Sequence, residues 1–195
     1  MAVQEIAIKE FWREFLRTEQ SMFAGETAAA ELRELIEHVN PDLEFDIGPL
    51  DEGKREIVIS AGGIRDAFPA VEALARGAPP LSRWNVVRYR QRHRVAGSIS
   101  FQGLSLSPAT IRFELPPGGP GSGIVLYMPG YSRAEHSRYL ALALLMLDAL
   151  LGEYDVEMKL GSIAIEALGG DRGSGAMTLD RLPGIFDASS HEQGN

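Results

Sequence analysis

The sequence predicts an α+β protein with a largely antiparallel or mixed sheet of five to seven strands and about four α-helices, packed mainly on one face of that sheet. Two observations support this prediction. Four segments have the apolar periodicity of helices, and the segments between them have the alternating or continuous apolar pattern of strands. Connections within residues 84–128 are too short for helical crossovers, so the strands there are expected to pair antiparallel.

The predicted helices differ in how they bury their apolar residues. In the first, apolar residues at helical spacing form one buried face: Ile8, Phe11, Trp12, Phe15 and Leu16. The last is apolar on almost every face from Tyr139 to Leu151, which indicates an interior helix. Ser132 and Glu135 before it have the spacing of a capping box. The helices are predicted over residues 4–20, 27–39, 66–76 and 132–151.

Strand patterns are of two kinds. Leu43, Phe45 and Ile47 alternate with acidic residues, as in a half-buried strand, and a turn at residues 51–53 makes this strand part of a hairpin. Residues 124–128 are continuously apolar, which favours a strand covered on both faces. Segments with strand character are residues 43–47, 55–59, 84–90, 98–102, 109–115, 124–128, 154–160 and 162–168.

The chain of 195 residues is long enough for one domain that buries about 70% of its unfolded surface. We predict that this single α+β domain covers residues 1–170. Residues 171–195 form a segment rich in glycine and serine, with an apolar island at Leu182, Ile185 and Phe186 that is expected to dock on the domain. Residues 189–195 are expected to be disordered.

Composition excludes several classes of site and partner. The chain has no cysteine, so disulfides, thiolate nucleophiles and zinc–thiolate centres are excluded. A formal net charge of −8 argues against general nucleic-acid binding. The N-terminus lacks the pattern of a signal peptide, and the longest apolar run, residues 140–151, contains Asp148 and is too short to span a membrane. We expect a soluble cytoplasmic protein with no membrane partner.

A row of arginines is the first candidate site. Arg88, Arg90, Arg92 and Arg94 are spaced by two, so on one uninterrupted strand they would all point to the same side. Such a row would bind a small anion or an acidic protein partner. The alternative is a solvated sheet face, on which these arginines pair with acidic residues of neighbouring strands. Candidates for those pairs are Glu44, Asp46, Glu56 and Glu114.

Three carboxylates form a second candidate. On a strand, Glu153, Asp155 and Glu157 would share one face and could hold Mg²⁺ or Ca²⁺, or act as the paired acids of a glycosidase. The sequence has no calcium-loop motif and no further ligand at fixed spacing, so these residues are only weak metal candidates and no metal site is predicted. The alternative is an exposed acidic face, or a set of partners for the arginines.

A serine hydrolase is a remote alternative. Residues 130–134 (GYSRA) lie between an apolar strand and a helix, as does the Gly-x-Ser-x-Gly nucleophile elbow of α/β-hydrolases. Ala134 replaces the final glycine of that motif. The only histidine downstream of Ser132, apart from neighbouring His136, is His191 in the predicted tail. A capping role explains Ser132 without any catalysis.

Over most of its length the sequence resembles a family of small bacterial α+β proteins that has no assigned activity. The resemblance lies in residues 78–84 (APPLSRW), which lead into residues 86–90 (VVRYR), and in a leucine-rich helix ending at residues 147–153 (LDALLGE). It implies the fold and no function.

The sequence therefore predicts a non-enzymatic binding or regulatory domain that engages an acidic partner or a small anion through its arginines. No catalytic residue and no cofactor are predicted, and the oligomeric state is left open. The alternative is an enzyme that acts on an anionic substrate with Glu153, Asp155 or Glu157 beside an arginine-lined face.

Overall fold

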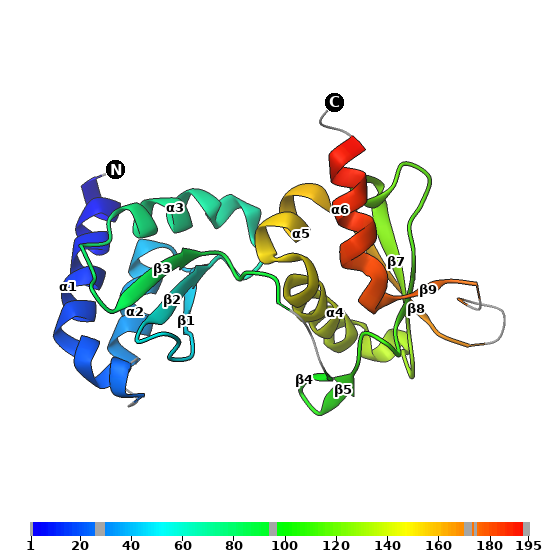
Figure 1. Cartoon of the computed structure of the whole chain (residues 1–195), viewed down its shortest axis with the longest axis horizontal. Coiled ribbons are helices and arrows are strands. Elements are labelled where there is room, and N and C mark those ends of the chain that lie inside the picture. The colour runs from blue at the N-terminus through cyan, green and yellow to red at the C-terminus, as the bar shows by residue number, and fades with distance from the viewer. Residues whose placement is uncertain (1, 26–29, 94–96, 170–172, 174, 193–195) are drawn as a thin grey trace. The chain divides into compact units, whose positions relative to one another are not determined.

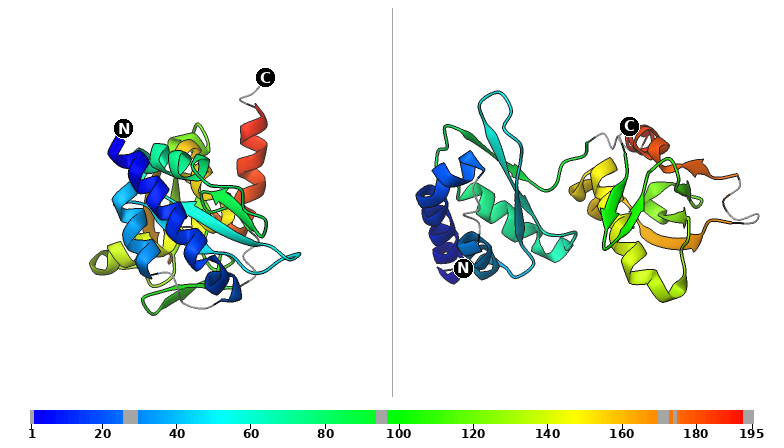
Figure 2. Two further views of the ribbon diagram at one scale, coloured as in Figure 1. Left: turned by 90° about the vertical axis from the view of Figure 1, so that its left-hand side faces the viewer. Right: turned by 90° about the horizontal axis from the view of Figure 1, so that it is seen from below.

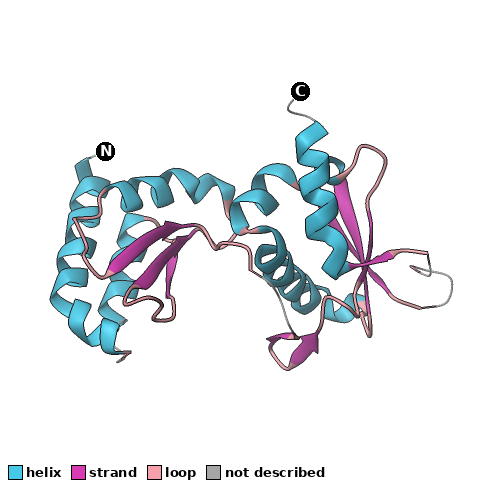
Figure 3. Cartoon of the chain, in the orientation of Figure 1, coloured by secondary structure: helices cyan, strands magenta, loops and turns pink. Residues whose placement is uncertain are grey.

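The computed structural model describes residues 2–25, 30–93, 97–169, 173 and 175–192. Within these residues the protein is α+β, as predicted, but it has six α-helices where about four were predicted (Figure 1; Figure 3). Its contacts divide the chain into two compact units, Met1–Arg90 and Gln91–Asn195. Each unit has a hydrophobic core of its own. The single domain over residues 1–170 stays a prediction, and the two units are described in turn.

The predicted single sheet is wrong, because the strands form three sheets of three, two and four strands. The strands do not form one sheet because the chain changes direction directly after the third of them. Tyr89, directly after the third strand, has a left-handed backbone (φ 62°), and the next strand begins only at Ile99. The break in backbone direction and the gap that follows it keep the third strand from continuing into the later ones.

In the N-terminal unit, three helices cover one face of a three-stranded sheet (Figure 2). The helices are α1 (Ala2–Ala24), α2 (Ala30–Val39) and α3 (Phe68–Arg76), and the strands are β1 (Glu44–Ile47), β2 (Arg55–Ser60) and β3 (Trp84–Arg88). β1 and β2 form the predicted antiparallel hairpin. β3 pairs with β2 in parallel, because α3 carries the chain back to the start of the sheet.

Aromatic residues of α1 form the centre of this first core, as their helical spacing predicts. Phe11 and Phe15 are fully buried and lie on either side of Trp12. The ring centroids of Phe15 and Trp84 of β3 are 5.1 Å apart, in an edge-to-face arrangement. Trp12 donates its indole N–H to the carbonyl of Leu74 in α3 at 2.8 Å. These contacts join α1 to both the sheet and α3.

In the C-terminal unit, three helices lie on one side of the four-stranded sheet (Figure 1). The helices are α4 (His136–Leu151), α5 (Glu153–Lys159) and α6 (Leu182–Glu192). The sheet has the order β8-β7-β6-β9, and its strands are β6 (Arg112–Glu114), β7 (Gly123–Met128), β8 (Ser162–Ala167) and β9 (Met177–Thr178). β6 and β7 are antiparallel as expected, whereas β7 and β8 are parallel. A separate hairpin, β4 (Ile99–Phe101) and β5 (Leu104–Leu106), packs on α4.

The strand predicted at residues 154–160 is helix α5. Its acidic and apolar residues alternate, which imitates a strand, but the backbone N–H of Val156 bonds to the carbonyl of Gly152 at 3.0 Å in helical fashion. Val156 is buried, while Tyr154 and Met158, four residues apart, are both exposed. On a strand these three residues would share one face, so the burial of Val156 alone fits a helix and not a strand.

The C-terminal apolar island docks on the second core, where Leu182 and Phe186 are buried. The helix that holds them, α6, continues to Glu192, although a disordered tail was predicted from residue 189. Residues 193–195 lie outside the described part of the chain.

Both units contain the same sequence of elements, which no repeat in the amino-acid sequence reveals. An antiparallel hairpin (β1–β2 or β6–β7) leads through a glycine turn into a 3-10 turn and a helix, and the chain returns as a parallel strand, in the C-terminal unit after the additional helix α5. Gly63 and Gly130 supply left-handed backbone in the two glycine turns, with φ of 78° and 72°. Each 3-10 turn begins with an arginine, Arg65 or Arg133.

The burial of α4 leads to a stability prediction with an internal control. Leu147 is fully buried, and we expect Leu147→Ala to lower the free energy of unfolding by about 2–5 kcal/mol because it leaves a cavity. Leu145 is 36% exposed on the same helix, so Leu145→Ala should cost less than about 1 kcal/mol. Urea unfolding of both variants measures the difference, and equal losses would mean that α4 is not oriented as described.

Candidate functional site

The predicted arginine row is split between the two faces of the N-terminal sheet. Arg88 is the last residue of β3, and Tyr89 after it has φ 62°, which breaks the alternation of side chains. Arg88 therefore pairs with Glu72 of α3, on the helix-covered side, at 2.7 Å. Arg90 pairs with Glu44 and Asp46 of β1, on the other side, at 3.2 and 3.1 Å. These are the pairs with neighbouring acidic residues that the sequence analysis left as the alternative.

The remaining arginines of the row belong to the C-terminal unit. Arg92 pairs with Asp187 of α6 at 2.8 Å, and Arg94 lies outside the described residues. The hydrogen bond and charge of Asp187, with a smaller contribution from Asp155, raise the pKa of Arg92. The hydrogen bond that Arg88 donates to Glu72 likewise raises the pKa of Arg88. Burial lowers the pKa of Arg90, but the carboxylates of Glu44 and Asp46 outweigh it and the net shift is upward. Each described arginine of the row thus has a carboxylate beside it.

The three carboxylates of α5 do not share a face. On a helix, two residues that are two positions apart are rotated by about 200° around the helix axis, so their side chains lie on nearly opposite sides. Glu153 is fully buried, while Asp155 is half-buried and forms an ion pair with Lys159 at 2.7 Å. Among the described residues, no group of three histidine, aspartate or glutamate side chains is placed to hold a metal ion.

Ser132 does not form the predicted capping box. It precedes the 3-10 turn Arg133–Glu135, and its hydroxyl makes no bond to a backbone N–H. Its Oγ instead lies 3.5 Å from Oε2 of Glu135, whose other oxygen accepts from Arg138 at 2.8 Å. The neighbouring histidine, His136, is bonded through Nδ1 to the hydroxyl of Tyr131 at 3.0 Å. The base beside Ser132 is therefore the carboxylate of Glu135, which Arg138 already engages, and the neighbouring histidine is directed to Tyr131 instead.

A hollow of about 420 Å³ lies where the parallel strands β7 and β8 end, and we call it the strand-end hollow. One wall is the segment after β7, and the other is the last part of β8. Ligands of open α/β sheets commonly bind at this edge. The hollow is lined by Tyr131, Ser132, Arg133, Ile165, Glu166 and Ala167.

Arg133 supplies the positive charge of the strand-end hollow. It is exposed, and within the described residues no hydrogen bond or ion pair engages its guanidinium. It also lies just before the 16-residue helix α4, whose N-terminal end carries a partial positive charge. Glu166 brings a carboxylate to the opposite wall. In the sequence this segment stands out for its serine, and the arginine at the turn from strand to helix is the further signal of a site.

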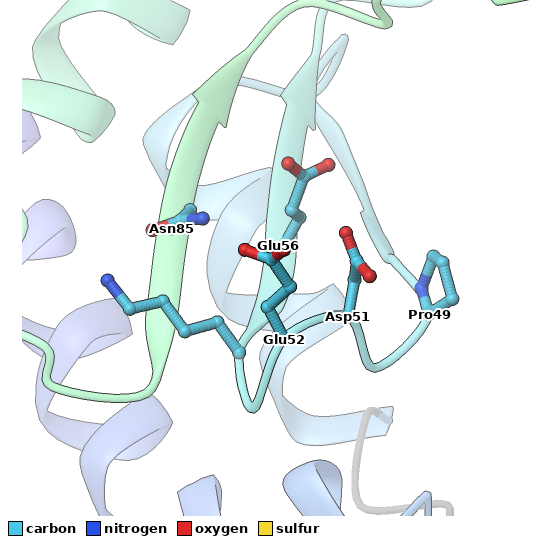
Figure 4. Close-up of a pocket in the computed structure, with 6 residues that line it drawn as sticks. Pro49, Asp51, Glu52, Glu56 and Asn85 are labelled. Carbon is cyan, nitrogen blue, oxygen red and sulfur yellow. The ribbon is translucent and has the colours of Figure 1, made fainter.

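A second hollow, of about 390 Å³, lies in the N-terminal unit, and we call it the hairpin hollow (Figure 4). It is formed by the turn of the β1–β2 hairpin together with the starts of β2 and β3. Half of its lining residues are acidic and one is basic; the lining comprises Pro49, Asp51, Glu52, Lys54, Glu56 and Asn85.

Comparisons of the chain with protein-family models, with curated proteins and with solved structures found no match. The resemblance to small bacterial α+β proteins therefore stays a prediction. Within the described part of the chain, no helix combines the length and apolar character needed to cross a membrane.

Arg88 and Arg90 differ in burial, so replacing each of them should change the free energy of unfolding by a different amount. The Arg90 side chain is 26% exposed and has two carboxylate partners, so Arg90→Gln should cost about 1 kcal/mol of unfolding free energy by leaving Glu44 and Asp46 unpaired. The Arg88 side chain is 56% exposed with one carboxylate partner, and Arg88→Gln should cost less. Chemical unfolding at low salt measures both losses. A larger loss for Arg88→Gln would contradict the described pairing.

Because the Ser132 hydroxyl caps no backbone group, Ser132→Ala should change the free energy of unfolding by less than about 0.5 kcal/mol. A true N-cap serine would cost about 1 kcal/mol when replaced. Thermal or urea unfolding separates these two values, and a loss of the larger size would restore the capping role.

Proposed function

We propose that this chain is a non-enzymatic binding protein whose ligand is a small anion, either a phosphate ester or a carboxylate, held in the strand-end hollow. The observation that carries the proposal is the contrast between arginines. Arg88, Arg90 and Arg92 lie beside carboxylates, whereas Arg133 has no such partner within the described residues and lines a hollow. The ligand is thus a small anion, as expected from the sequence, but its proposed site is at Arg133 and not at the arginine row.

The position of Arg133 adds two attractions for an anion. The backbone N–H groups in the first turn of a helix have no carbonyl partner within the helix and can donate to a ligand. The macrodipole of α4 acts in the same direction. A guanidinium beside these groups can form paired, charge-assisted hydrogen bonds to a phosphate or a carboxylate.

The size and lining of the hollow indicate the kind of ligand. Its volume of about 420 Å³ is within the range of small-molecule pockets, roughly 300–1,000 Å³. Glu166 on the opposite wall would repel a second negative charge and accept hydrogen bonds from hydroxyl or amino groups. The ligand that fits has its anionic end at Arg133 and neutral or cationic donors toward Glu166.

The enzyme alternatives draw less support from the geometry. The histidine next to Ser132, His136, is hydrogen-bonded to Tyr131, and the carboxylate near Ser132, that of Glu135, already accepts from Arg138. On α5, Glu153 is buried and Asp155 is paired with Lys159, so these carboxylates do not form an open pair. General acid–base catalysis requires such groups within reach of one substrate. Binding without catalysis is the simpler proposal.

We expect the wild-type chain to bind inorganic phosphate and glycerol phosphate at low ionic strength and to show a higher melting temperature in their presence. Arg133→Gln should weaken this binding about tenfold, because it removes the charge-assisted pair. Glu166→Gln should strengthen it, because a repulsive carboxylate is removed. Titration calorimetry and thermal shift measure both changes, and added salt should reduce the wild-type affinity.

Arg88→Gln is the matched control, since it makes the same change of charge away from the hollow. Its affinity for phosphate should equal that of the wild type. If Arg88→Gln or Arg90→Gln abolished binding while Arg133→Gln did not, the anion would be held by the arginine row instead. Citrate is titrated in the same way as a carboxylate probe, and no binding of any of the three anions by the wild type would contradict the proposed ligand class.

A further inference from the structure

One face of the N-terminal sheet is left without helices, and we call it the open face. In β1, Phe45 points to the helix-covered core and is buried, while Glu44 and Asp46 point the other way and are exposed. The strand register extends this face across the sheet, aligning Asp46 with Val58 and Val87, and Glu56 with Asn85. The open face consists of Glu44, Asp46, Glu56, Val58, Asn85 and Val87.

The open face combines an apolar centre with an acidic border. Val58 and Val87 are neighbours in the register and are half-buried, so part of each remains accessible. Glu44, Asp46 and Glu56 around them are exposed. Such a face offers apolar contact at its middle and attraction for positive charge at its edges.

The hairpin hollow lies at one end of this face and shares Glu56 and Asn85 with it. In Figure 4 the carboxylates of Glu52, Asp51 and Glu56 extend from the hairpin along the same side as Asn85. No ion pair engages these three carboxylates within the described part of the chain. The hollow is therefore suited to a further cationic group besides Lys54, the cation in its lining.

We infer that the open face and the hairpin hollow together form a docking surface for a basic segment of a partner protein. Five carboxylates border this surface (Glu44, Asp46, Asp51, Glu52 and Glu56), against two cations, Arg90 and Lys54. This charge attracts lysine or arginine and repels nucleic-acid phosphates. The aliphatic stems of those side chains can lie on Val58 and Val87 while their charged ends reach the acidic border.

A metal ion is a poorer occupant, because the described carboxylates do not come together as a metal-binding group. The inference is independent of the proposed anion site, which lies in the other unit and has the opposite charge preference. Failure of one does not imply failure of the other.

The test uses the full chain and a short labelled peptide in which arginine alternates with alanine, measured by fluorescence anisotropy. We expect the peptide to bind the wild type and to bind less tightly as salt is added. The double variant Glu52→Gln/Glu56→Gln should bind about fivefold more weakly, since it removes two attractive charges. Val87→Ser should weaken binding at high salt as well, because it removes apolar contact area.

The matched control is Glu34→Gln/Glu37→Gln, which makes the same change in net charge on exposed positions of α2. This variant should retain the wild-type affinity. Equal weakening by both double variants would overturn the inference, because the peptide would then respond only to the overall negative charge. Absence of binding by the wild type at low salt would overturn it too. Spermine that binds as tightly as the peptide and is unaffected by Val87→Ser would assign the surface to a small polycation instead.

Discussion

The burial of α4 against β6, β7 and β8 is the constraint on which the C-terminal unit depends. Leu142, Met146 and Leu147 are fully buried, and strand β7 is apolar along its length. Because this helix has to lie flat on the sheet, its first turn comes beside the carboxyl ends of β7 and β8. The strand-end hollow is a consequence of that packing, since the segment that joins β7 to α4 forms one of its walls.

In the N-terminal unit, too, helices pack on one face of a sheet, but different residues form the core. Its hairpin, crossover helix and parallel strand follow the same order, but α1 and α2 add an aromatic cluster to the covered face. All of its helices lie on that side (Figure 2). Two layers are sufficient for a hydrophobic core, and the second face of the sheet is then left to charged residues and two valines. The open face is available to a partner because the helices of this unit cover only the other face of the sheet.

Charge pairing separates arginines with a structural role from an arginine available to a ligand. Arg90 joins β1 to the end of β3 through two carboxylates, and Arg92 joins the segment after β3 to α6. Such pairs position chain segments and contribute modestly to stability. Arg133 is the same type of residue, but it lines the strand-end hollow, and no carboxylate pairs with it among the described residues. Arg90 and Arg92 differ from Arg133 because the fold places carboxylates beside the first two and none of the described ones beside Arg133.

The sequence by itself determined the α+β class, the aromatic face of α1, the β1–β2 hairpin and the interior position of α4, because periodicity over many residues reports which side of an element is buried. It did not determine α5, where alternating apolar and acidic residues imitate a strand over seven residues, or the division into three sheets. It also could not place the arginines, because one residue with left-handed backbone, Tyr89, turns Arg88 and Arg90 to opposite faces. Only tertiary structure decides such contacts, since they join residues such as Arg90 and Glu44 that are far apart in the chain.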